Sequence, residues 1–190
     1  MRRLTLVLLL VAVLAGCSDD DDAGPTTSVA TPAGEIALRG DGLGVVDLGE
    51  APEEAIDAVT DELGEPTLDS GWGDPFSPYG TCPGDRVRGV EWGGLTLLFA
   101  DGETEQGSGE HLFAWRVVGA PPAISTVKGL GFGATATDAA ELYPDQVEVV
   151  PADDPFPAFL EVEAEGGRIT AYLDDAHTIT NLEAGTPCGE

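Results

Sequence analysis

The chain has 190 residues, of which 35 are acidic and only 8 are basic, so its formal net charge is −27. A surface this acidic repels the phosphates of nucleic acids and the headgroups of anionic lipids. The composition therefore argues against nucleic-acid binding and against a polybasic membrane contact, and it favours basic polypeptides or cations as partners. A second interpretation stays open, in which the charge only keeps the protein soluble and monomeric.

The chain begins with the pattern of an export signal. Arg2 and Arg3 precede an apolar run over residues 4–14, which is too short to span a bilayer as a mature helix. We therefore expect residues 1–16 to be a signal peptide, against the alternatives of a buried helix or a permanent membrane anchor. Its removal would leave 6 basic and 35 acidic side chains, a net charge of −29.

The apolar run ends in Leu14, Ala15, Gly16 and Cys17. This sequence resembles the lipobox of bacterial lipoproteins, in which small residues precede a cysteine that becomes the first residue of the mature chain. The resemblance implies that the thiol of Cys17 carries a diacylglycerol. It also implies a lipid-anchored protein on the extracytoplasmic face of the cell membrane, because two or more acyl chains hold a protein there without other lipid contacts.

Residues 17–34 contain a run of aspartates at positions 19–22, followed by Gly, Pro, Thr, Ser and Ala. Such a composition buries too little apolar area to offset the entropy of ordering, and its like charges repel one another. We predict a disordered acidic tether between the membrane and the folded part. Adjacent aspartates lack the alternating ligand positions of a calcium loop, so no metal site is expected here.

Residues 35–190 are long enough for a single domain with one core. Once Cys17 carries lipid, only Cys82 and Cys188 remain, in a compartment where thiols are commonly oxidised. We predict that they form a disulfide, which on the chain-entropy model would contribute about 4 to 5 kcal/mol. A metal site or a reactive thiol are the alternatives, and neither has a supporting motif.

The domain shows a pattern of helix and strands twice, over residues 35–120 and 121–190. Each copy opens on a glycine-rich segment, at 42–49 and at 128–133, that predicts a short strand.

A helix follows each opening. The first is predicted over residues 52–63, with Pro52 at its first position and Gly64 after its end. The second is predicted to begin after Thr135, which stands at capping-box spacing from Asp138, and to end before Pro144.

Strand-like runs follow each helix, with paired glycines at the first hairpin of each set. They cover residues 90–92, 95–99 and 111–118 in the first copy, and residues 159–164, 168–173 and 177–184 in the second. The predicted fold class is α+β, with two repeats of one helix plus three or four antiparallel strands and with helices packed on an antiparallel sheet.

The repeated order of glycine-rich opening, helix and meander over residues 42–185 resembles that of secreted actinobacterial lipoproteins. It is similar in architecture to the β-lactamase inhibitory proteins. The resemblance implies an inhibitory function as one direction, and it implies no particular inhibitory residue, because a shared architecture does not identify a site.

The segment 71–82 is the candidate recognition surface. Trp72, Phe76 and Tyr79 stand there among glycines and prolines, which predicts a loop, and a bond at Cys82 would order these rings before a partner arrives. We expect Trp72, Phe76 and Tyr79 to bind a protein or peptide partner, preferably a basic one. The alternative is that these rings cover the core. Trp92 and Trp115, which lie on predicted strands, are expected in the core.

No catalytic motif, metal-ligand spacing or cofactor-binding motif stands out, so we expect a binding or inhibitory module rather than an enzyme, without metal or cofactor. His111 and His177 are each predicted to begin a strand at corresponding positions, which favours a structural role. Two alternatives remain open. One is a cell-envelope hydrolase that uses carboxylates with His111 or His177, and the other is a structural accessory of the envelope.

Overall fold

The computed structural model describes residues 36–119, 124–154 and 156–189. The predicted signal peptide, lipidated cysteine and tether lie outside the described residues. Two helices are present in this part of the chain, α1 at Pro52–Leu63 and α2 at Ala136–Leu142. Neither of them is long and apolar enough to cross a membrane.

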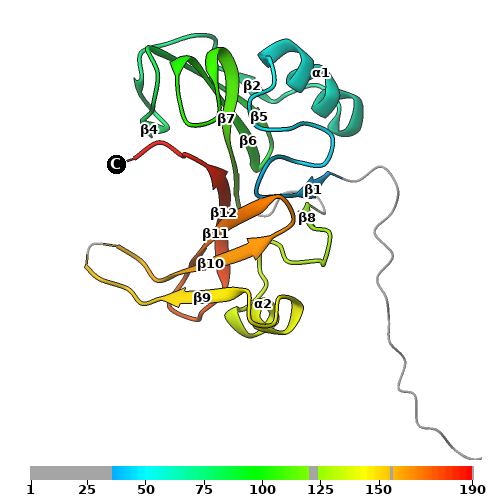
Figure 1. Cartoon of the computed structure of the whole chain (residues 1–190), viewed down its shortest axis with the longest axis vertical. Coiled ribbons are helices and arrows are strands. Elements are labelled where there is room, and N and C mark those ends of the chain that lie inside the picture. The colour runs from blue at the N-terminus through cyan, green and yellow to red at the C-terminus, as the bar shows by residue number, and fades with distance from the viewer. Residues whose placement is uncertain (1–35, 120–123, 155, 190) are drawn as a thin grey trace, which may run out of the picture.

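Eight strands form one sheet in the order β2-β5-β6-β7-β12-β11-β10-β9, and every neighbouring pair is antiparallel. Four of these strands follow α1 and four follow α2, and the two groups meet where β7 pairs with β12 (Figure 1). The strands are β2 (Leu68–Asp69), β5 (Arg86–Trp92), β6 (Leu95–Glu103), β7 (Ser108–Val118), β9 (Val147–Val150), β10 (Phe159–Ala164), β11 (Gly167–Leu173) and β12 (Ile179–Gly185). The α+β class with an antiparallel sheet is confirmed, while the repeat itself stays a prediction.

Both predicted helices are present, and their ends follow from local chemistry. Pro52 is the first residue of α1, and the N–H of Gly64 after its last residue donates to the carbonyl of Thr60. In α2 the Thr135 side chain accepts from the N–H of Asp138, whose carboxylate accepts from the N–H of Thr135. This is the predicted capping box, with Asp in place of the usual Glu or Gln.

The two strands predicted in the glycine-rich openings are wrong. Residues 42–49 and 128–133 form turns with isolated bridges, and each contains glycines at positive φ, such as Gly44 at 80° and Gly129 at 90°. Such glycines reverse the chain and interrupt a strand. The short strands lie just before these segments, as β1 (Ala37–Leu38) and β8 (Ser125–Thr126), and they pair with each other in parallel.

The main core lies between one face of the sheet and the two helices, which lie on the same side of it in Figure 1. Alternate residues of the strands point into this core. Trp115 is fully buried and Trp92 is 4% exposed, as predicted, and the indole N–H of Trp115 donates to the carbonyl of Arg39. The buried tryptophan therefore keeps a partner for its polar atom.

Within the described part of the chain, a smaller apolar cluster covers the opposite face of the sheet over β5, β6 and β7. Leu98, Phe113 and Ala114 pack there against both cysteines, with Tyr79 at the margin. Next to this cluster, towards β12 and β11, the same face carries polar residues. Arg116 of β7 and Glu183 of β12 are directly opposite each other in the register of the two strands. We call this uncovered part of the sheet the open face.

Candidate binding groove on the open face of the sheet

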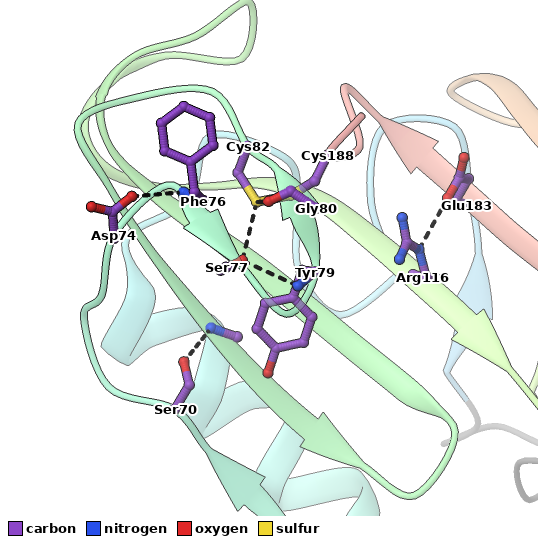
Figure 2. The surroundings of a disulfide bond; sticks show 11 residues. Ser70, Asp74, Phe76, Ser77, Tyr79, Gly80, Cys82, Arg116, Glu183 and Cys188 are labelled. Atoms are coloured by element: carbon purple, nitrogen blue, oxygen red, sulfur yellow. Dashed lines mark hydrogen bonds and ion pairs between the residues drawn. A yellow bond between two sulfur atoms is a disulfide. The ribbon is translucent and has the colours of Figure 1, made fainter. Parts of the chain in front are cut away.

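The disulfide between Cys82 and Cys188 is present, with the two Cα atoms 4.1 Å apart and 106 positions between them in sequence (Figure 2). It joins a small hairpin, β3 (Phe76–Ser77) and β4 (Gly80–Thr81), to the C-terminal end of the described chain. Thr81 and Gly189 add a pair of backbone hydrogen bonds of 2.7 and 2.9 Å. The predicted disulfide is confirmed, and the predicted loop is irregular except for this hairpin.

Tyr79 lies under the hairpin against the sheet. Its ring occupies the space where a Cβ would stand at Gly89 of β5, and its hydroxyl donates to Glu91 at 3.1 Å. Burial, followed by the neighbouring Glu91 carboxylate, raises the pKa of Tyr79 to about 12. Tyr79 therefore helps to hold the segment 71–82 on the sheet and is only partly accessible.

The structure separates the three aromatic residues predicted to bind a partner. Trp72 is partly buried against the main core, with the guanidinium carbon of Arg86 5.2 Å from its ring centroid. Phe76 is 77% exposed. Figure 2 shows the rings of Phe76 and Tyr79 pointing to opposite sides of the hairpin. These residues do not form one aromatic surface.

A groove of about 850 Å³ lies on the open face beside the disulfide. One wall is formed by residues 78–80 of the hairpin, together with residues 187–189 near the C-terminus. The other wall is formed by Phe156 and Pro157 of the connection between β9 and β10, which projects from the sheet in Figure 1. Both walls therefore consist largely of proline and aromatic side chains.

The floor of the groove is polar and comes from the central strands. Nε of Arg116 on β7 donates to Glu183 on β12 at 3.1 Å, and the hydroxyl of Tyr172 on β11 donates to the other carboxylate oxygen at 2.7 Å. Glu183 is 3% exposed, whereas the Arg116 side chain is 24% exposed. The hydrogen bond to Glu183 uses only Nε, and no hydrogen bond from the two terminal nitrogens of Arg116 is found within the described residues (Figure 2). The paired charges leave a neutral floor with guanidinium N–H groups available as donors.

Sequence reasoning missed Phe156, Arg116, Tyr172 and Glu183. One signal was available for Phe156, because the tripeptide Asp-Pro-Phe occurs at 74–76 and again at 154–156. The first copy lies between β2 and β5, and the second lies between β9 and β10. The alternation of β7 and β11 also places Arg116 and Tyr172 on the face opposite the core.

Neither histidine begins a strand. His111 is the fourth residue of β7 and is 1% exposed, and its Nδ1 lies 2.9 Å from the carbonyl of Gly109. Because a carbonyl only accepts, Nδ1 donates to it, and Nε2 lies at hydrogen-bond distance, 2.6 Å, from the hydroxyl of Thr104. His177 lies in the turn before β12, at a φ of 60°, which is incompatible with a strand. Neither residue lines the groove.

Comparison with known proteins identifies the N-terminal segment only. Residues 1–18 match the family model described as the prokaryotic membrane lipoprotein lipid attachment site. No curated protein and no solved structure matches the chain. The chain therefore carries the attachment site of a prokaryotic lipoprotein and is held by lipid on the extracytoplasmic face of the membrane.

Proposed function

We propose that the mature domain is a binding module, rather than an enzyme, and that its groove receives a segment of a polypeptide partner outside the cytoplasm. The groove itself carries the proposal. It combines apolar walls with a few polar groups at its floor, Arg116 and Asn181 among them, and this combination is typical of ligand sites.

The hairpin wall of the groove is held in place before any partner binds. The disulfide, the backbone pair between Thr81 and Gly189 and the hydroxyl bond of Tyr79 all restrain it. A wall that is already ordered loses little conformational entropy on association. The disulfide predicted to order the aromatic loop thus supports binding in the neighbouring groove.

The binding residues of this proposal differ in part from those expected from the sequence. Tyr79 remains, as part of the hairpin wall, and Phe156 enters, as the exposed aromatic ring of the opposite wall. We assign Trp72 to the packing of the domain. Phe76 becomes an exposed ring outside the groove lining, which makes it a useful control.

Two observations support the finer proposal that the domain consists of two repeats. Each helix precedes four strands in the same order of pairing, and each Asp-Pro-Phe copy lies in the corresponding connection. In this interpretation both connections are equivalent elements that lie on either side of the central strands. The predicted architecture suggests inhibition as the specific form of binding. In that form the domain would block the binding or active site of its partner.

Site-specific photo-crosslinking in intact cells tests the function. A photoreactive phenylalanine analogue replaces Phe156 in one variant and Asp57, an exposed residue of α1, in a control variant. We expect a discrete crosslinked product from position 156 and none from position 57. Absence of any product from position 156, or the same products from both positions, would refute the groove as a partner site.

A further inference from the structure

We infer, on the basis of the proposed function, that the groove takes a proline-rich extended segment with a basic residue beside it. The walls supply the first reason. Tyr79 and Phe156 face the groove from its two sides, and Tyr172 contributes a third aromatic ring at the floor. Aromatic-lined grooves bind polyproline II segments, because such segments are already extended and lose little entropy on binding.

The floor supplies the second reason. A polyproline II segment makes no internal hydrogen bonds, so its carbonyls need donors from the partner. Nε of Arg116 is used by Glu183, and the terminal nitrogens of the guanidinium make no hydrogen bond within the described residues. The charge of Arg116 is balanced by Glu183, so the floor suits uncharged carbonyl oxygens better than a free carboxylate.

Asn181 adds a second polar side chain to the floor beside Arg116. Its Oδ1 is closed to solvent and has no hydrogen-bond partner among the described residues. A ligand therefore reaches the amide group of Asn181 from the side of its NH2 group, which is a donor, as the guanidinium of Arg116 is. Two donor groups at the floor suit a segment that presents backbone carbonyls.

Charge determines the flanking residue. Asp153 and Asp154 are exposed in the same connection as Phe156, and Asp153 exchanges two backbone hydrogen bonds with Phe156. The turn therefore places carboxylates next to an aromatic wall of the groove. A lysine or arginine beside the proline core would meet these carboxylates, in agreement with the strongly acidic composition of the chain.

The test uses the mature acylated chain in mild detergent and fluorescence anisotropy of labelled, amidated peptides. The probe peptide carries an arginine followed by a Pro-x-x-Pro core. One matched peptide has alanine in place of the prolines, and a second has glutamate in place of the arginine. We expect the probe to bind at least about tenfold more tightly than the alanine peptide, and more tightly than the glutamate peptide at low salt.

Two protein variants distinguish binding in the groove from non-specific binding of the peptide to exposed aromatic rings. Phe156→Ala should weaken binding of the probe about tenfold or more, since an aromatic anchor at an interface often costs this much on truncation. Phe76→Ala removes a ring that is 77% exposed, compared with 60% for Phe156, and should leave the affinity unchanged. Neither exposed ring contributes to the buried core, so both variants should fold.

The inference is overturned if the alanine or glutamate peptide binds as tightly as the probe, or if the two phenylalanine variants weaken binding equally. Failure of the probe to bind, together with a discrete crosslink from position 156, would reject the proline-rich occupant and leave the proposed function standing. Failure of both experiments would reject both.

Discussion

Removal of the disulfide should lower the stability of the domain by about 4 to 5 kcal/mol. The bond joins Cys82 and Cys188 across 106 positions. On the chain-entropy model, closing a loop of this length lowers the conformational entropy of the unfolded chain by an amount worth about 4 to 5 kcal/mol. Native domains are stable by only about 5 to 15 kcal/mol, so this is a large part of the total. The two cysteines are 6% and 8% exposed, so replacing both with alanine also removes packing from the small cluster.

Urea unfolding followed by tryptophan fluorescence measures this difference. The variant Cys82→Ala with Cys188→Ala is compared with the parent chain, and both carry Cys17→Ser so that lipid does not interfere. We expect a lower free energy of unfolding and a larger denaturant dependence in the variant, because its unfolded state is less compact. A reducing agent should bring the parent chain to the variant's stability. A difference below about 1 kcal/mol, or no effect of reduction on the parent, would show that this reasoning is wrong.

Three further predictions concern the anchor, the hairpin and the tyrosines. Cys17→Ser should move the protein out of the membrane fraction, and recovery of the unlipidated parent chain in the medium would contradict the anchor. Gly89→Ala should destabilise the domain by about 1 to 3 kcal/mol in thermal or urea unfolding, because the added Cβ clashes with the Tyr79 ring. Gly73→Ala is the matched control, since its Cβ would meet its nearest neighbour at 3.9 Å, and equal losses in the two variants would argue against the contact. In a spectrophotometric titration two of the three tyrosines, Tyr79 and Tyr143, should ionise near pH 12. Because the folded-state pKa of each is raised, the stability that they contribute is complete below about pH 10 and is lost as the pH rises through about 12. Tyr79→Phe should remove one of these two transitions.

Local signals predicted the helices and the disulfide. Pro52 and Gly64 bound the first helix, and Thr135 with Asp138 caps the second, because each of these effects acts within one turn of helix. The disulfide needed no geometry, because lipidation of Cys17 leaves only one way to pair the remaining cysteines. These features depend on residues close in sequence or on simple counting, which is why they are accessible without a structure.

Features that depend on backbone reversal were predicted less well. The glycine-rich openings have the composition of a short buried strand, yet positive φ at residues such as Gly44 and Gly129 turns the chain there. The strands β1 and β8 contain only two residues each and exist because they pair with each other across the two halves. An alternating pattern cannot be recognised over two residues, so the sequence does not indicate either strand or their pairing. The same holds for His177, whose turn conformation interrupts the predicted strand.

The groove depends on long-range pairing, and this explains why the recognition surface was expected on the loop alone. Alternation along β7 indicates that Arg116 faces away from the core, but only the register between β7 and β12 brings it to Glu183, 67 positions later. Each half of the chain contributes one member of this ion pair and one aromatic wall, Tyr79 from the first half and Phe156 from the second. Neither half contains the groove by itself. Binding in the groove should therefore require the complete sheet, and any change that separates β7 from β12 should abolish it even where each group of four strands remains folded.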